Sequence, residues 1–226
     1  MARSPETTES QPRWEQRSAE RVVDSARDRL LARSRRFVEK ATEVVARDGV
    51  DGLTLRAVLS ETGLSRRAFY ERFESKDDLL VAVFEETLRS AAETYRRQMD
   101  AKGLEAPLDR LRFLVEEMIT VATREAADSD GGLPTAMSRE HLRLAESRPD
   151  ELRQALAPTT DLMAELIGDA MKSGAVRSGD SHELAVMVHT LVSSMIHSAL
   201  FGGSSRPDAA HTAEAVWDFC RRALVA

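Results

Sequence analysis

The sequence predicts an all-α protein, and two observations carry that prediction. Apolar residues recur at helical spacing through most of the 226 residues, and no stretch alternates as a half-buried strand would. Aromatic residues make up only 5% of the chain, and turn-forming residues are few, with 11 glycines and 7 prolines. This composition favours long helices joined by short connections over a sheet.

The first segment, residues 1–27, is polar and charged and is expected to form a flexible arm. Its arginines could lie along a phosphate backbone, or the arm could have no role. Helical periodicity begins at about Asp28 and continues through Phe37. The glycines of "DGVDG" (48–52) are expected to end this first helix.

Two short helices follow, separated by a tight turn. Thr54 can N-cap the helix "LRAVLSET", and Gly63 ends it because the sharp reversal requires a positive φ or a close backbone approach. Ser65 caps a third helix that reaches Phe73. Two short helices joined in this way form a helix-turn-helix.

The remaining helices are longer. "SKDD" (75–78) matches the capping box that opens a fourth helix, which runs to about Met99. Clusters of glycine, proline and serine separate five further expected helices at 108–127, 135–146, 151–173, 181–201 and 208–224.

The charge is unevenly spread along the chain, whose net charge is −6. Residues 11–76 carry 15 Lys and Arg against 11 Asp and Glu, a net of +4, whereas residues 77–226 carry a net of −9. A basic N-terminal third on an acidic remainder suggests a division of labour, although chance clustering on solvated helix faces would give the same totals.

Several function classes are excluded. The sequence contains no Gly-x-Ser-x-Gly elbow, P-loop, dinucleotide fingerprint or Cys/His pairing, so we expect no enzyme and no cofactor. A single cysteine and unmatched histidine spacings argue against a metal site. No run approaches the roughly 18 apolar residues of a membrane span, and the N-terminus lacks the apolar region of a signal peptide. We therefore expect a cytoplasmic protein without a membrane contact.

The short helix after Ser65 has two faces. Ala68, Phe69 and Phe73 can point inward. The other positions remain for the outside: Ser65, Arg66, Arg67, Tyr70, Glu71 and Arg72. A helix of this size fits the DNA major groove, where arginine can donate two hydrogen bonds to guanine. The alternative is an ordinary amphipathic helix with solvated arginines.

The segment "GLTLRAVLSETGLSRRAFYERFESKDDLLVAVFEE" (52–86) resembles the DNA-binding domain of TetR-family transcriptional regulators. The matching residues are Thr54, Arg56, Val58, Gly63, Leu64, Ser65, Tyr70, Phe73, Ser75, Lys76, Asp78 and Leu79. The resemblance implies a three-helix DNA-binding domain at 28–75, followed by a helical body at 76–226 that dimerises and usually binds an effector.

The resemblance also implies DNA contacts. Thr54, Tyr70 and Lys76 would touch phosphates. The positions that would face bases are Ser65, Arg66, Arg67 and Ala68, and Arg56 completes the predicted DNA-binding set. Arg67 stands where the family commonly has glycine, and Ala68 where it commonly has threonine, so the operator sequence does not transfer from a relative.

The last two expected helices are candidates for a dimer interface. The helix 181–201 is apolar on more than one side and must be covered on both faces. The predicted interface residues are Leu184, Val188, Leu191, Met195, Val216, Trp217 and Cys220. A dimer would hold two recognition helices about 34–36 Å apart, the spacing of palindromic half-sites. The alternative is that both helices close the core of a monomer.

Methionines spread over the central helices can line a pocket for an apolar ligand, although each could equally be ordinary core. The expected ligand-binding residues are Phe84, Phe113, Met118, Met137, His141, Met163 and Met187. His189 and His197 are the other polar groups expected near it. The sequence thus predicts a dimeric repressor that a small, largely apolar effector releases from a palindromic operator. The alternative is a regulator whose body binds a protein partner or no effector.

Overall fold

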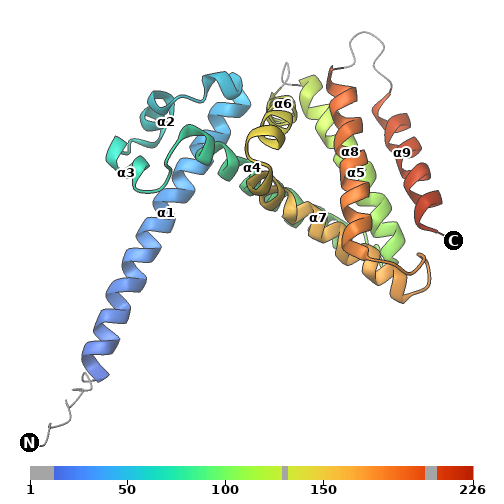
Figure 1. The fold of residues 1–226 in the computed structure, drawn as a ribbon, viewed down its shortest axis with the longest axis horizontal. Helices are drawn as coiled ribbons and strands as arrows, with labels where there is room; N and C mark the ends of the chain where they lie inside the picture. The colour runs from blue at the N-terminus through green and yellow to red at the C-terminus, as the bar shows by residue number, and fades with distance from the viewer. Residues whose placement is uncertain (1–12, 129–131, 202–207, 226) are drawn as a thin grey trace, which may run out of the picture.

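The computed structural model describes residues 13–128, 132–201 and 208–225, and within these ranges the chain is helical with no strand. The helices are α1 (Arg13–Gly52), α2 (Leu55–Thr62), α3 (Arg66–Tyr70), α4 (Lys76–Ala101), α5 (Pro107–Asp128), α6 (Gly132–Ser147), α7 (Pro149–Lys172), α8 (Ser181–Phe201) and α9 (Ala209–Leu224). Figure 1 shows a small head of α1–α3 at one end and a bundle of α5–α9 at the other. The all-α prediction is confirmed.

The predicted caps bound the short helices. The hydroxyl of Thr54 accepts a hydrogen bond from the backbone N–H of Ala57 at 3.1 Å and so caps α2. Gly63 ends α2 with a φ of 65°, the left-handed conformation that its position predicted. Ser75 and Asp78 form both hydrogen bonds of the capping box that opens α4.

The first helix differs from the prediction at its start. It begins at Arg13 rather than at about Asp28, so residues 13–27 are helical and not a flexible arm, while residues 1–12 lie outside the described residues. This segment has too few apolar residues to show a period, yet it contains no glycine or proline and is rich in arginine, glutamate and alanine, which favour helix. Figure 1 shows it projecting from the head as a rod. At its other end Gly49 takes a φ of 71°, within the glycine segment predicted to end the helix.

The head is built around aromatic rings. Phe37 of α1 packs edge-on against Phe69 and Phe73, with ring centroids 5.6 and 6.1 Å apart. The first turns of α4 complete this core through Leu80 and Val83. We call this group the head cluster, and it continues into the body through Ala136, Leu144, Leu152 and Ala155 of α6 and α7.

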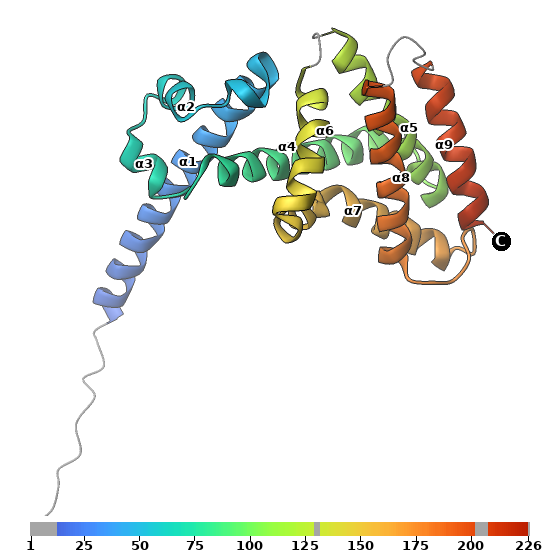
Figure 2. The same cartoon turned by 45° about the horizontal axis from the view of Figure 1, so that its top comes forward.

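The body has a second core, the body cluster, formed by α5, α7, α8, α9 and the later turns of α4. Figure 2 shows α4 running from the head into the bundle. Its early residues Leu80 and Val83 belong to the head cluster, whereas Tyr95 and Met99 belong to the body cluster. The expected division between 28–75 and 76–226 therefore falls where α4 begins, but α4 itself is shared by both cores.

The apolar residues of α8 and α9 that we expected at a dimer interface are mostly inside the single chain. Val188, Val216, Trp217 and Cys220 are buried in the body cluster, and the remaining three, Leu184, Leu191 and Met195, are partly buried against it. The prediction that these four buried residues contact a partner subunit is therefore wrong, because their side chains already pack inside one chain. Because α8 is apolar on more than one side, its sequence does not reveal which stripe faces inward.

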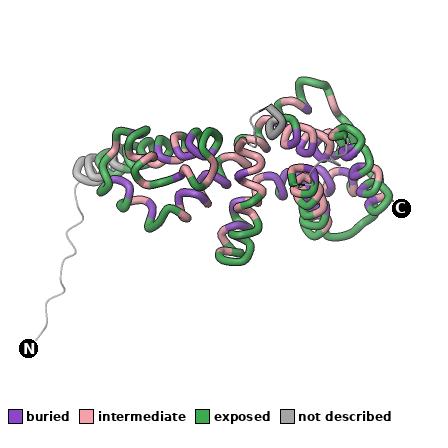
Figure 3. The backbone as a smooth tube through the Cα atoms, turned by 90° about the horizontal axis from the view of Figure 1, so that it is seen from above, coloured by how far each residue is buried: buried purple, intermediate pink, exposed green. Residues whose placement is uncertain are grey.

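The outward stripes carry other apolar residues. Val186 and Met187 of α8 are exposed, Met187 by 57%, and Phe219 of α9 is 65% exposed. By length and composition α8 could cross a membrane, yet it packs within the bundle against α5, α7 and α9. Figure 3 shows buried and exposed positions alternating along the helices, as expected where each is covered on one side.

Candidate functional site

The outer surface of the helix-turn-helix presents basic side chains. Arg66 and Arg67 lie at the start of α3, which Ser65 caps by accepting a hydrogen bond from the N–H of Ala68 at 3.1 Å. The side chain of Arg67 is 91% exposed, and its Nε lies 3.1 Å from Glu71 Oε1. An ion pair this exposed contributes little to stability, so Arg67 can exchange Glu71 for another partner.

The other predicted DNA-binding residues are also accessible, with one exception. Exposed residues of the predicted set are Thr54, Arg56, Ser65, Arg66, Arg67, Tyr70 and Lys76. Tyr70 stands edge-on against the buried ring of Phe69, with centroids 5.3 Å apart. The exception is Ala68, which is 7% exposed and belongs to the head cluster, so the expectation that it faces bases is wrong.

Arg72 is a second correction on this surface. Its side chain is 4% exposed rather than outward, and its guanidinium donates to the carbonyl oxygen of Ala68 and lies 3.5 Å from that of Leu30. The helix α3 ends at Tyr70, so the helical spacing that would have placed Arg72 outside does not extend to it. Arg72 instead ties the end of α3 to α1.

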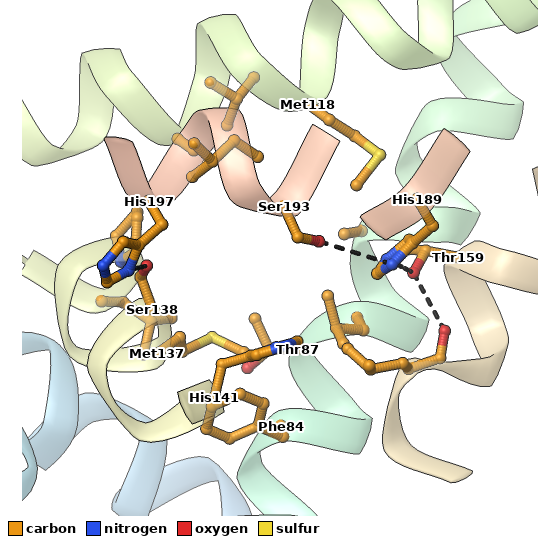
Figure 4. A pocket seen from close by; sticks show the side chains of 18 of the residues that line it. Phe84, Thr87, Met118, Met137, Ser138, His141, Thr159, His189, Ser193 and His197 are labelled. Atoms are coloured by element: carbon orange, nitrogen blue, oxygen red, sulfur yellow. Dashed lines mark hydrogen bonds between the residues drawn. The ribbon is translucent and has the colours of Figure 1, made fainter. Parts of the chain in front are cut away.

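The body contains a cavity of about 610 Å³ between α4, α5, α6, α7 and α8 (Figure 4). This volume lies within the usual range of small-molecule sites. Most of its wall is apolar, with Phe84 and Tyr95 from α4, Met118 from α5, Met137 from α6 and Leu156 from α7. Its polar side chains carry imidazoles and hydroxyls, and some of them form hydrogen-bonded pairs.

One polar pair joins α7 and α8. The hydroxyl of Thr159 donates to the carbonyl oxygen of Leu156 at 3.1 Å and lies 3.1 Å from Nε2 of His189. Nδ1 of the same ring lies 3.5 Å from Oγ of Ser193, so each ring nitrogen of His189 has a hydroxyl as its neighbour. Burial, together with the nearby His141, lowers the pKa of His189 to about 4, so this imidazole is neutral near pH 7.

A second polar pair lies at the opposite end of the cavity in Figure 4, where Ser138 Oγ is 2.9 Å from His197 Nδ1. Between the pairs lies His141, whose pKa is lowered by burial and by the charge that His197 can carry. Thr87 of α4 also lines the cavity, and its Oγ1 is buried with no hydrogen-bond partner in the described part of the chain.

The structure brings together part of the predicted ligand-binding set. Phe84, Met118, Met137 and His141 line the cavity, as do His189 and His197. Three others do not, and their assignment was wrong: Phe113, Met163 and Met187. Phe113 packs on the outer side of the body cluster beneath Lys102, Met163 is fully buried in that cluster, and Met187 faces outward.

Sequence reasoning missed the hydroxyl groups that line the cavity, those of Thr87, Tyr95, Ser138, Thr159, Thr190, Ser193 and Ser194. A serine or threonine inside a helix commonly faces solvent or bonds the carbonyl one turn earlier, so its type and position carry no signal for a pocket. The methionines failed for a related reason, because a methionine fills core and cavity wall equally well.

The cavity touches the head through shared side chains. Phe84 lines the cavity and is also a member of the head cluster, and Leu133, Met137 and Leu156 of the cavity wall pack against that cluster. Ion pairs reinforce the link. Arg143 of α6 donates to both carboxylate oxygens of Asp77 at 3.0 and 3.1 Å, and Arg148 pairs with Asp78 at 2.5 Å. The first turn of α4 is thus fastened to α6 and to the start of α7.

Comparison with known proteins identifies the family. Residues 37–83 match the family of "Bacterial regulatory proteins, tetR family". An uncharacterized HTH-type transcriptional regulator of Mycobacterium bovis is 30% identical over 165 residues, which cover 73% of this chain and 80% of that protein. The chain belongs to the TetR family.

Solved structures share the fold of this TetR-family chain. FadR from Bacillus subtilis, in complex with stearoyl-CoA, superposes with a TM-score of 0.62 at 16% identity, over 82% of this chain and 96% of FadR. RolR in complex with resorcinol gives 0.65 at 13% identity, over 87% of this chain and 89% of RolR. The family assignment makes this protein a DNA-binding transcriptional regulator and not an enzyme.

Proposed function

We propose that this TetR-family protein is a cytoplasmic homodimeric repressor, released from a palindromic operator when a small, largely apolar effector binds in the body. The observation that carries the proposal is Phe84, which lines the 610 Å³ cavity and packs in the head cluster at the same time. The ligands of FadR and RolR, stearoyl-CoA and resorcinol, support a ligand-responsive role, since both proteins share this fold.

On the DNA side, the exposed arginines of α3 supply base contacts and neighbouring residues supply phosphate contacts. Arg66 and Arg67 project from a short helix whose inner side is held by aromatic packing. Thr54 and Lys76 lie at the starts of α2 and α4, where unpaired backbone N–H groups favour phosphate. Glu71 is held by Arg67 in the free protein and is released when Arg67 contacts DNA.

The dimer uses the outward stripes of α8 and α9. The exposed side chains of Val186, Met187 and Phe219 form the apolar part of this interface. The inward-facing apolar residues of α8 and α9 are not available because they pack in the body cluster. Large exposed apolar residues on neighbouring helices are typical of an interaction surface. A two-fold axis through this surface leaves both heads at the far end of the dimer, free to meet two half-sites.

Release follows from a shift between two positions of the head. A ligand in the cavity presses on Phe84 of α4 and on Met137 of α6, both of which pack against the head cluster. The ion pairs of Asp77 with Arg143 and Asp78 with Arg148 oblige α4 to follow α6 and α7. A 100-fold weakening of operator binding requires a coupling of about 2.7 kcal/mol, which is within the usual range.

The test is fluorescence anisotropy of a labelled duplex from the region upstream of the protein's own gene, together with light scattering. We expect a dimer that binds this duplex more tightly than a scrambled one. Arg66→Ala should remove that preference, whereas Arg153→Ala, on an exposed arginine of the body, should leave it unchanged. A monomer that binds both duplexes equally would refute the proposal.

A further inference from the structure

We propose that the cavity is built for an uncharged ligand: an apolar body that carries hydroxyl, carbonyl or amide groups and no ionised group. This inference rests on the proposed effector site and concerns its chemistry, which neither the family nor the similar structures determine.

The described part of the wall contains no carboxylate, ammonium or guanidinium to pair with an ionised ligand. Among the described residues that line the cavity, none is Asp, Glu, Lys or Arg. A carboxylate, phosphate or ammonium entering this apolar space would lose its hydration without gaining an opposite charge, which is strongly unfavourable. Among the described lining residues, the phenyl and phenol rings are those of Phe84 and Tyr95 from a single helix, too few to form the cage that holds quaternary ammonium groups.

The histidines do not replace the missing cation. His189 is buried, and its Nε2 lies 3.1 Å from the hydroxyl of Thr159, so this nitrogen is already engaged within the protein. The pKa of His141 is lowered by burial and by the charge that His197 can carry. In the described part of the wall, the titratable groups are Tyr95 from α4, His141 from α6, and His189 and His197 from α8. None of these groups is a carboxylate, an ammonium or a guanidinium, the side chains that are ordinarily ionised at neutral pH.

Hydroxyl groups remain available on two walls. Thr87 of α4 lines the cavity, and its buried Oγ1 has no hydrogen-bond partner in the described part of the chain, so a turn of this side chain would bring the oxygen to a ligand oxygen or N–H and relieve a costly arrangement. Ser193 of α8 is only weakly engaged, 3.5 Å from His189. Its hydrogen can turn toward a ligand acceptor, and its oxygen can accept from a ligand donor. Figure 4 places Thr87 and Ser193 on different sides of the cavity, so polar groups at two points of one ligand can be bonded together.

The test is isothermal titration of the full chain at pH 7.5 with four probes of one skeleton: 2-naphthol, naphthalene, 2-naphthoate and 2-naphthylmethylammonium. We expect 2-naphthol to bind at least tenfold more tightly than either ion and several-fold more tightly than naphthalene. Equal or tighter binding of either ion, or no binding of 2-naphthol at millimolar concentration, would overturn the inference.

Two variants test whether the hydroxyl of Thr87 forms a hydrogen bond with the ligand. Thr87→Val keeps the shape and removes the oxygen, and it should weaken 2-naphthol about fivefold or more while leaving naphthalene unchanged. Thr87→Ser should retain the wild-type preference. Thr94→Val is the matched control on the same helix, because Thr94 is not among the described lining residues. Equal affinities of wild type and Thr87→Val for 2-naphthol would show that Thr87 does not form a hydrogen bond with the hydroxyl of this probe.

The inference and the proposed function fail in different assays. If 2-naphthol binds selectively but operator affinity is unchanged at saturation, the cavity chemistry holds and the effector role for this ligand class does not. If an ionised probe binds more tightly and also releases DNA, the regulator responds through this cavity and the uncharged class is wrong.

Discussion

The shared position of Phe84 makes a quantitative prediction, because one substitution should weaken the head and alter the cavity together. Phe84 is 2% exposed. Full burial of a phenylalanine removes about 150–250 Å² from water, which at about 25 cal/mol per Å² gives an upper bound of roughly 4–6 kcal/mol. Measured Phe→Ala losses are about 3–5 kcal/mol. One side of this ring already borders a cavity, so we expect the lower end, about 3 kcal/mol.

The measurement is urea unfolding of Phe84→Ala followed by tryptophan fluorescence and circular dichroism. The protein concentration must be fixed because the proposed dimer makes stability depend on it. Val23→Ala, at an exposed position on the projecting part of α1, is the control and should change the free energy of unfolding by less than about 0.5 kcal/mol. A loss below about 1 kcal/mol for Phe84→Ala would refute the claim that this ring supports the head cluster.

The same variant tests the coupling. If Phe84 transmits ligand binding, Phe84→Leu, which retains an apolar side chain, should keep operator binding and reduce the change in operator affinity that a ligand causes. Unchanged ligand release in Phe84→Leu would mean that transmission runs through α6 and its ion pairs instead.

The other predictions concern DNA, assembly and pH. Arg67→Ala should reduce the free-energy difference between operator and scrambled duplex by about 1–3 kcal/mol. Lys76→Ala should weaken binding to every duplex and reduce the slope of log K against log salt concentration by about one. Both are measured by anisotropy at several salt concentrations. Phe219→Glu should convert dimers to monomers in light scattering, and a persistent dimer would move the interface elsewhere. For His189, the folded pKa of about 4 lies below the ordinary 6.5, so the unfolded chain binds more protons between these values and stability falls as pH drops through this window. This contribution to stability is about 3 kcal/mol, fully present above pH 6.5 and fully lost below pH 4, and urea unfolding of His189→Gln should lack this part of the pH dependence.

Local signals were the most reliable part of the sequence. Thr54, Gly63 and the Ser75–Asp78 capping box set helix ends through their own hydrogen bonds and dihedral angles, and the structure has each of them. Such features depend on neighbours in the chain and can be inferred without the fold.

Features decided by packing were less predictable. Whether Trp217 and Cys220 face a partner or their own core depends on which side of α9 packs against α5. The sequence of α9 alone does not indicate that side. The cavity shows the same limit. Its volume results from the arrangement of five helices, and the hydroxyl of Thr87 becomes significant only because the described parts of those helices give it no hydrogen-bond partner.

The buried side chain of Arg72 has a consequence for how operator choice can change. With five residues, α3 is too short to fix its own orientation, which depends on supporting contacts with α1. These contacts are the hydrogen bond from Arg72 to the carbonyl oxygen of Leu30 and the packing of the Phe37 ring against Phe69. Substituting one of these supporting residues would tilt α3, and with it Arg66 and Arg67, without changing the arginines themselves. The positions able to redirect this regulator to a new promoter are therefore more numerous than those that meet a base, and some of them lie on α1.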